Sequence, residues 1–334
     1  MTNRPIVVLG AGAWGTALAL HLANSGQHVH LWSIETDHIE QMRKERTNNR
    51  YLPGFAFPSS LHPIADLSEA IQNVNDILIA VPSAGFRDTL LLLKPFIKTS
   101  QCIVWATKGL DMEKGQLLHE TAQEILGTKN KYAVLSGPSF ASEVAAGLPT
   151  AVAIASKHSD FAQELLTRFN RNMFRVYLSS DITGVEIGGV VKNVLAIATG
   201  ISDGMGFGAN ARCALIARGL AEMVRLGTAL GANIETLIGL AGLGDLVLTC
   251  TDDQSRNRQF GLALGKNQNM AAAEKSIGHV VEGKRNAELV IQLAKKHHVD
   301  MPISEMIVAI LQERLTPKDA MQNLLAREPK REKP

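Results

Sequence analysis

The sequence is short of cysteine and of net charge, and each shortage excludes a class of protein. Its 334 residues include three cysteines, Cys102, Cys213 and Cys250, with no CxxC or metal-ligand spacing. An odd number at such spacing argues against a disulfide framework and fits a reducing compartment. The net charge of +2 gives no broad attraction to nucleic acid or to an anionic membrane. We therefore expect no bound metal and no nucleic-acid partner.

Long apolar runs are also missing. No uninterrupted run reaches the roughly 20 residues that a membrane-spanning helix needs. The early stretch "IVVLGAGAWGTALALHLA", preceded by Arg4, superficially resembles a signal peptide. Its glycines stand at a phosphate-loop spacing, however, and strand-like residues follow directly, so we interpret it as a strand, a turn and a helix. We expect a cytoplasmic protein without membrane insertion.

Short β-branched runs alternate with helical patterns over the first half of the chain. Most of these runs are continuously apolar, which is typical of strands in a sheet that is covered on both faces. The alternation predicts an α/β fold with a doubly wound, mostly parallel, Rossmann-type sheet. The expected strands are 6–10, 28–32, 76–81, 102–107, 132–136, 150–155 and 173–178, and the expected helices include 13–25 and 86–97.

Strand-like runs stop after "SSDITG", and long helical patterns follow. We predict two domains, a dinucleotide-binding domain over residues 1–180 and an all-helical substrate and catalytic domain over residues 181–334. The apolar character of the helical domain is compatible with a homodimer. The expected helices are 184–202, 208–230, 255–265, 283–297 and 303–313.

The stretch "VVLGAGAWG" places Gly10, Gly12 and Gly15 in a GxGxxG array between a predicted strand and a predicted helix. The first glycine permits the tight turn, the second lets the backbone approach a pyrophosphate, and the third lets the helix pack against the sheet. The helix N-terminus supplies amide donors to the anion. A packing turn without a ligand would show the same glycines, but the strand–turn–helix–strand context favours a dinucleotide site.

The end of the second predicted strand leaves the choice between NADH and NADPH open. An NAD site usually carries an acidic residue there to hold the ribose hydroxyls. This chain has "LWSIE", with Ser33 and Ile34 at the expected place and Glu35 slightly beyond. The segment offers no acid in register and no arginine for a 2′-phosphate.

The stretch "GGVVKNVLAI" contains one lysine in a run that otherwise looks suited to burial. Lys192 is the only charged residue between Glu186 and Asp203, and apolar residues recur around it at helical steps. Such a lysine either extends its amine to a nearby surface or faces a functional cleft. Burial lowers the pKa of a lysine toward the range that proton transfer requires, so Lys192 is a candidate catalytic residue.

Four further stretches combine glycine with polar residues. In "WATKGL", Lys108 follows a strand at the carboxyl edge, where open α/β sheets bind ligands. In "LSGPSFASE", we expect Ser139 to cap a helix. In "LAGLGDLVLTC", Asp245 stands among apolar residues, which is costly unless the carboxylate is paired. The triplet "SRN" stands at an apparent helix start that suits a phosphate or a carboxylate.

Plainer explanations exist for most of these residues. Lys108 alone is compatible with an ordinary solvent-exposed lysine, and Ser139 with a purely structural cap. Arg256 and Arg258 are compatible with a surface pair. Asp245 is harder to explain in this way.

Taken together, the motifs resemble the bacterial-type NAD(P)-dependent glycerol-3-phosphate dehydrogenases over nearly the whole chain. The resemblance rests on "GAGAWGTALA", "ATKGL", "SGPSFA", "VVKNVLAI", "NARCALIARGL", "AGLGDLVLTC", "SRNRQFG" and "VVEGKRN", in this order. It implies reduction of dihydroxyacetone phosphate to sn-glycerol 3-phosphate with NADP or NAD as cofactor, and it favours NADPH somewhat, although the sequence does not settle the preference. One departure is Ile34, where many family members carry a basic residue.

Carried over residue by residue, the resemblance implies Lys192 as the proton acceptor in glycerol 3-phosphate oxidation, with Lys108 and Asp245 as further catalytic groups. The implied substrate ligands are Lys108, Gly137, Ser139, Lys192, Asp245, Ser255, Arg256 and Asn257. The implied cofactor-binding residues are Gly10, Gly12, Ala13, Trp14, Gly15, Ser33, Lys108, Ala141, Arg256, Val280 and Glu282.

Two rival functions stay open from the sequence. One is a related two-domain dehydrogenase acting on a 2-hydroxyacid or on ketopantoate, although "SRN" and "ATKGL" favour a phosphorylated triose. The other is a non-catalytic dinucleotide sensor, which has no need for Lys192 and Asp245 beside a phosphate site.

Overall fold

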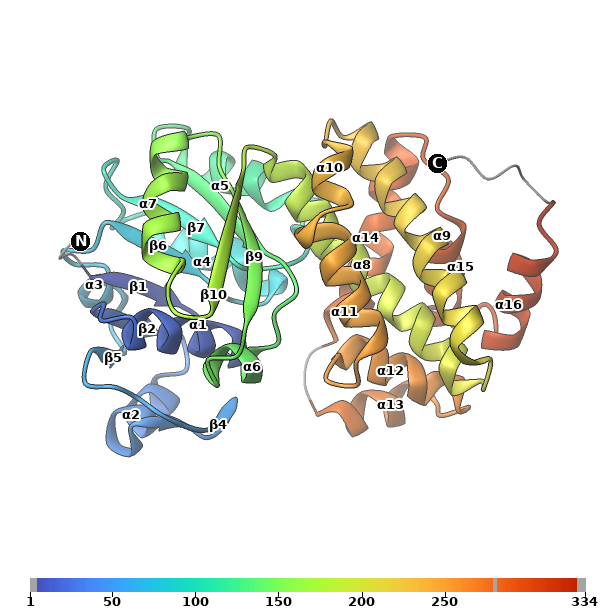
Figure 1. The fold of residues 1–334 in the computed structure, drawn as a ribbon, viewed down its shortest axis with the longest axis horizontal. Coiled ribbons are helices and arrows are strands. Elements are labelled where there is room, and N and C mark those ends of the chain that lie inside the picture. The colour runs from blue at the N-terminus through green and yellow to red at the C-terminus, as the bar shows by residue number, and fades with distance from the viewer. Residues whose placement is uncertain (1–4, 279–280, 329–334) are drawn as a thin grey trace. The chain divides into compact units, whose positions relative to one another are not determined.

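The computed structural model of the protein describes residues 5–278 and 281–328. The chain divides into two compact units. We name them the sheet unit, Met1–Gly189 with Gly231–Asp245, and the helical unit, Val190–Leu230 with Leu246–Pro334. The domain boundary near residue 180 stays a prediction. Figure 1 shows the strands and helices of each unit.

The sheet unit is built on eight strands in the order β10-β9-β8-β7-β6-β1-β2-β5. Neighbouring strands are parallel except for β8 and β9, which are antiparallel. A separate antiparallel hairpin pairs β3 with β4. The strands are β1 (Ile6–Leu9), β2 (Val29–Trp32), β3 (Thr47–Asn48), β4 (Leu52–Ala56), β5 (Leu61–Ile64), β6 (Asp76–Ile79), β7 (Cys102–Trp105), β8 (Tyr132–Ser136), β9 (Thr150–Ala155) and β10 (Phe174–Ser179). The predicted parallel-dominated sheet is confirmed, and β3, β4 and β5 are additions to the prediction.

Helices cover both faces of this sheet. The helical segments of the sheet unit are α1 (Ala13–Asn24), α2 (Thr36–Glu45), α3 (Leu67–Ala70), α4 (Ser83–Leu93), α5 (Leu118–Leu126), α6 (Ala141–Ala145), α7 (Ser159–Phe169), α10 (Ile234–Leu237) and the π-helix η1 (Leu240–Gly244). Along β1, Ile6 and Val8 join the core that includes residues of α1 and α7, while Val7 and Leu9 join the core that includes residues of α4 and α5. Alternate side chains of a strand point to opposite faces, so an apolar strand fills both cores at once.

Helix α8 (Ile182–Gly204) begins in the sheet unit and continues into the helical unit. By length and composition it is apolar enough to cross a membrane, as is the segment Ile234–Thr251. The apolar window of α8 is entirely buried inside the protein, as in the core helix of a soluble protein. Its composition therefore reflects burial on all sides.

The helical unit contains the rest of α8 and seven further helices, within the residues that the structure describes. They are α9 (Gly208–Ala229), α11 (Asp245–Thr251), α12 (Arg256–Gly265), α13 (Met270–Ile277), α14 (Glu282–Lys296), α15 (Pro302–Leu311) and α16 (Pro317–Leu325). The predicted helices in this half are thus present.

Helices α8 and α12 approach each other closely through glycine. A Cβ at Gly200 would collide with the carbonyl of Arg258, and a Cβ at Gly261 would collide with the carbonyl of Ile197. Asn257 at the start of α12 hydrogen-bonds Asn193 of α8 at 2.9 Å. Because these contacts advance together along both helices, the two run parallel, and the start of α12 lies at the level of Asn193.

Candidate functional site

The glycine loop has the geometry expected of a dinucleotide site. Gly10 has φ +114°, a value that favours glycine, and a Cβ at Gly15 would collide with the carbonyl of Gly10. At Gly12 a Cβ would meet no atom within 4 Å, so nothing in the fold itself requires a glycine there. The open space in front of Gly12, at the N-terminus of α1, fits an approaching pyrophosphate.

Beside the glycine loop, the indole N–H of Trp14 is a hydrogen-bond donor without an acceptor among the described residues. Trp14 lies at the start of α1, and its buried Nε1 has no hydrogen-bond partner among the described residues. Ala13 and Ala141 pack against the same core cluster as Trp14, because α6, which begins at Ala141, packs against α1. Buried donors in folded proteins normally find a partner, so the indole N–H is available to a ligand. These residues fit a bound dinucleotide.

The strand-end segment differs from its sequence-based description. Ser33 is buried, and its hydroxyl accepts a hydrogen bond from the backbone N–H of Glu35 at 3.2 Å. The segment itself contains no arginine, but the fold brings one to it from the turn between β3 and β4. Arg50 lies beside Glu35, with Nη1 3.2 Å from its carboxylate. The arginine is distant in sequence, so the strand-end pattern does not reveal it.

Lys108 and Asp245, both in the sheet unit, form an ion pair of 2.5 Å. Lys108 Nζ also donates to the carbonyl of Gly137 at 3.3 Å. The Asp245 side chain is 1% exposed, so this pairing compensates a carboxylate that would otherwise be costly to bury. The structure thus brings together three of the predicted residues, and the solvent-exposed alternative for Lys108 does not hold.

Ser139 does not cap a helix, so that expectation is wrong. Helix α6 begins at Ala141 with Phe140 in the cap position. The Ser139 hydroxyl instead donates to the carbonyl of Gly137 at 2.9 Å. Phe140 occupies the cap position, so Ser139 lies one residue before it and its hydroxyl is engaged within the turn after β8.

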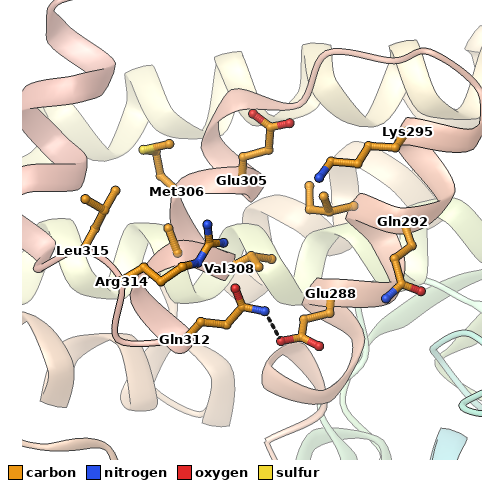
Figure 2. Close-up of a pocket in the computed structure, with 11 residues that line it drawn as sticks. Glu288, Gln292, Lys295, Glu305, Met306, Val308, Gln312, Arg314 and Leu315 are labelled. Atoms are coloured by element: carbon orange, nitrogen blue, oxygen red, sulfur yellow. Dashed lines mark hydrogen bonds between the residues drawn. The ribbon is translucent and has the colours of Figure 1, made fainter.

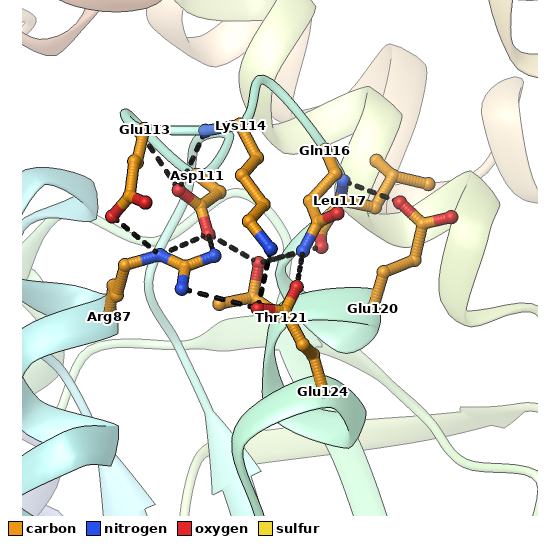
Figure 3. A network of polar contacts seen from close by, with 9 residues as sticks. All are labelled: Arg87, Asp111, Glu113, Lys114, Gln116, Leu117, Glu120, Thr121 and Glu124. Atoms are coloured by element: carbon orange, nitrogen blue, oxygen red, sulfur yellow. Dashed lines mark hydrogen bonds and ion pairs between the residues drawn. The ribbon is translucent and has the colours of Figure 1, made fainter.

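The loop that follows Lys108 is held by Asp111 (Figure 3). Its Oδ2 accepts hydrogen bonds from Arg87 Nη2 at 2.6 Å and from the Thr121 hydroxyl at 2.7 Å. Burial acts to raise the pKa of Asp111, but the hydrogen bonds from Arg87 and Thr121 outweigh it and leave the pKa below its usual value. A charged, multiply bonded anchor of this kind fixes the backbone on which Lys108 stands.

Lys192 belongs to the part of α8 in the helical unit. It is 7% exposed, and its Nζ donates to the Thr249 hydroxyl at 2.9 Å. The alternative in which the amine reaches the surface therefore does not hold. Thr249 lies on α11, four residues after Asp245, so the two side chains share one face of that helix.

The start of α12 carries the predicted "SRN" triplet. Ser255 is the N-cap, and its hydroxyl accepts from the backbone N–H of Arg258 at 3.2 Å. Arg256 is exposed, whereas Arg258 is buried and paired with Asp203 at 2.8 Å. The surface-pair interpretation thus fails for Arg258, which is a structural cation. Arg256 makes no ion pair with any residue that the structure describes.

Asn257 also fixes the start of the next site segment. Its Oδ1 accepts a hydrogen bond from the backbone N–H of Gly283 at 2.9 Å, while its Nδ2 donates to Asn193. Glu282 is the first residue of α14, and Val280 lies outside the described residues. Asn193 and Thr249 are not predictable from the sequence, since a buried amide or hydroxyl on an apolar helix carries no spacing signal.

Two other features lie apart from these residues. Among the described residues, no three His, Cys, Asp or Glu side chains gather into a metal-like group. A pocket of about 630 Å³ in the helical unit is lined by residues of α14 and α15, including Glu288, Lys295 and Glu305 (Figure 2). None of the predicted site residues lines this pocket.

Comparison with known proteins covers both halves of the chain. The model for the N-terminus of NAD-dependent glycerol-3-phosphate dehydrogenase matches residues 5–162, and the model for its C-terminus matches residues 181–322. A glycerol-3-phosphate dehydrogenase [NAD(P)+] of Coxiella burnetii is 53% identical over 99% of both chains. One of Shewanella sediminis is 52% identical over 98% of both. A crystal structure of the Coxiella burnetii enzyme has a TM-score of 0.94, covering 97% of this chain and 99% of that one.

Proposed function

The chain belongs to the NAD-dependent glycerol-3-phosphate dehydrogenase family, and from this premise we propose which of its side chains carry out the reaction. It is an oxidoreductase that reduces dihydroxyacetone phosphate to sn-glycerol 3-phosphate with NADH or NADPH. The ketopantoate-type and sensor alternatives are not favoured, because relatives that match the full length are named for this activity. The observation that carries the assignment of roles is the buried Lys192 amine, held by Thr249.

Lys192 is the proton donor in the reducing direction. NAD(P)H, held at the glycine loop, would supply the hydride to C2, and the carbonyl oxygen of the substrate needs one proton to become the hydroxyl. Lys192 as an ammonium gives that proton, and as an amine it accepts it back during oxidation. Thr249 holds the Nζ at 2.9 Å, which limits the directions in which the amine can point.

Lys108 and Asp245 act as a charged pair beside the reacting oxygen. The ammonium of Lys108 stabilises negative charge that develops on the oxygen. Asp245 holds Lys108 at 2.5 Å and prevents its amine from turning to solvent. Within the sheet unit, Asp245 therefore orients Lys108.

The start of α12 binds the substrate phosphate. Arg256 is exposed at this helix N-terminus, where backbone amides and a guanidinium together favour a phosphate. Ser255 and Asn257 flank it. Because the start of α12 lies at the level of Asn193, the residue after Lys192, a phosphate bound there keeps the triose near the amine. Gly137 and Ser139 hold the substrate from the turn after β8.

The residues that fit the cofactor lie at the glycine loop. Gly10, Gly12 and Gly15 shape the turn, while Ala13 and Trp14 begin the helix that faces the pyrophosphate. The other proposed cofactor contacts are Ser33, Lys108, Ala141, Arg256, Val280 and Glu282.

We place this enzyme in the cytoplasm, where its product supplies phospholipid synthesis. We also expect a homodimer, which light scattering would test.

The first experiment follows NADPH and NADH oxidation with dihydroxyacetone phosphate. We expect Lys192→Ala to lower kcat by about 10²–10⁴-fold, since general acid–base groups contribute that much. Binding of NADPH, measured by fluorescence, should stay within twofold. Lys266→Ala is the control, because Lys266 is an exposed lysine of the same unit. Turnover that survives Lys192→Ala would contradict the proton-transfer role, and turnover of ketopantoate instead would contradict the substrate.

A further inference from the structure

At the adenosine-ribose end of the dinucleotide site, the sequence lacks the charged residue that usually distinguishes NADH from NADPH. In this fold the residue at the end of the second strand holds the ribose hydroxyls if it is acidic, and a nearby arginine accommodates a 2′-phosphate. Here Ser33 is buried and engaged with the backbone of Glu35, and Ile34 is 72% exposed. Neither side chain provides a charge, so selection between the two cofactors must come from elsewhere.

The turn between β3 and β4 brings a cation to this position. Arg50 Nη1 lies 3.2 Å from Glu35 Oε1, and its Nη2 lies 3.6 Å from Asp37 Oδ2. The Tyr51 hydroxyl contacts both oxygens of Glu35, at 3.2 and 3.0 Å. The Arg50 side chain is 42% exposed, so part of the guanidinium faces solvent.

This turn is tied to the glycine loop by one buried side chain. Asn48 Nδ2 donates to the carbonyl of Ala11 at 2.8 Å and to Thr16 Oγ1 at 2.7 Å. Its Oδ1 accepts from the backbone N–H of Tyr51 at 3.1 Å. Asn48 is fully buried, so these bonds are protected from water. The position of Arg50 relative to the dinucleotide loop is therefore fixed by the fold.

We propose that Arg50 binds the 2′-phosphate of NADPH and makes this chain prefer NADPH to NADH. A guanidinium matches a phosphate with paired hydrogen bonds and keeps its charge at every physiological pH. In the free protein Glu35 holds Arg50 in place. The proposal rests on dinucleotide use by the family and adds which residue distinguishes the two cofactors.

Glu35 opposes Arg50 in this selection. Its carboxylate repels a 2′-phosphate, and it is also a natural acceptor for ribose hydroxyls in NADH. Removal of the carboxylate charge should therefore strengthen NADPH binding, whereas removal of the guanidinium should weaken it. Variants at the two positions change the preference in opposite directions, which a general loss of folding does not do.

Binding to the full-length chain, measured by calorimetry without substrate, tests the proposal. The titrants are NADPH and NADH, together with adenosine 2′,5′-bisphosphate and 5′-AMP, which differ in the 2′-phosphate alone. We expect Arg50→Gln to weaken NADPH and the bisphosphate by about 10-fold or more, and to leave NADH and 5′-AMP within twofold. Glu35→Gln should strengthen NADPH. Lys44→Gln, which removes an exposed charge from α2, should change neither preference.

Three results would overturn the assignment of Arg50. These are an unchanged NADPH affinity in Arg50→Gln, an equal loss for NADPH and NADH, and a wild-type chain that does not distinguish the two cofactors. Retained NADH binding in the variant reports an intact dinucleotide site. Loss of dihydroxyacetone phosphate turnover with intact cofactor binding would instead contradict the proposed roles of Lys192 and Lys108. Failure of the Arg50 proposal and failure of the proposed function are therefore distinguishable.

Discussion

Two adjacent glycines of α8 have different structural requirements. A Cβ at Gly188 would collide with the backbone carbonyl of Ala241, whereas a Cβ at Gly189 would lie at an ordinary 3.4 Å from Lys108 and Ser136 side-chain atoms. We expect Gly188→Ala to lower the free energy of unfolding by about 1–3 kcal/mol through overpacking. Gly189→Ala should leave it unchanged or raise it by up to about 1 kcal/mol, since alanine favours a helix.

Urea denaturation of the two variants measures this difference. Each variant is the control for the other, because both add one methyl group to the same helix turn. Equal destabilisation by both would show that the helix tolerates no added methyl group here, and would contradict the distinction. The group that constrains Gly188 is the backbone of η1 at Ala241.

Single charged residues with a functional or structural role are easier to predict from the sequence than their partners. Asp245 stood out because an aspartate among apolar residues needs a partner, and Lys108 supplies it at 2.5 Å. The partner itself was not predictable, since 137 residues separate the two. Arg50 escaped detection for the same reason, because only the β3–β4 hairpin brings it to Glu35.

At the scale of elements, the strands in the interior of the sheet were predictable and the edge was not. In the interior, β1 is continuously apolar and buried on both faces, and β6 is buried throughout and apolar after Asp76. β5 contains Pro63, which cannot donate to a ladder and so argues against a strand. The structure places β5 at the edge of the sheet, paired with β2 alone, where a proline is tolerated.

A buried titratable pair ties α8 to α5 and β7. Glu186 accepts hydrogen bonds from Trp105 Nε1 at 3.1 Å and from His119, whose Nδ1 lies 2.7 Å away. Burial acts to lower the pKa of His119, but the hydrogen bond and charge of Glu186 outweigh it and leave the pKa above the usual 6.5. Burial also raises the pKa of Glu186.

The pair makes stability depend on pH with a definite sign. A raised pKa means that the folded state holds its proton more tightly than the unfolded chain does. The contribution of His119 is therefore complete below about pH 6.5 and is lost as pH rises through the folded pKa. We expect the difference in unfolding free energy between wild type and His119→Asn to be largest at pH 5.5 and to shrink toward pH 8.5.

Asparagine suits this comparison because its amide retains a donor near the position of Nδ1 without titrating. Chemical denaturation at a series of pH values gives the result. A difference that grows as pH rises would contradict the proposed direction of the His119 shift, and a constant difference would show that the histidine contributes through packing alone.

At the scale of the whole molecule, the sheet unit is discontinuous in sequence. Ile182 and Val185 of α8, together with Ala241 of η1, belong to the same buried core as the side chains of β7. Burying an aliphatic side chain contributes about 1.5–3 kcal/mol. A fragment ending at residue 180 loses all three residues and Glu186 as well. We expect it to bind a hydrophobic dye and to unfold without a cooperative transition.

The matched comparison is a fragment ending at Asp245 in which a Gly/Ser linker of about 20 residues replaces 190–230. Such a linker spans ~25 Å on average and keeps the returning segment attached. Thermal unfolding followed by circular dichroism should show a cooperative transition for this fragment alone. The same transition temperature in both fragments would mean that the returning segment adds nothing to the core.

This discontinuity also sets an order of events during translation. Domains generally fold as units while the ribosome extends the chain from its N-terminus. The glycine loop, Lys108 and every strand of the sheet leave the ribosome well before Asp245, which ends the returning segment. The ion pair between Lys108 and Asp245 must therefore form late, after α9 has been synthesised. A nascent chain released before Asp245 is synthesised carries the glycine loop and Lys108 but lacks the carboxylate that pairs with Lys108.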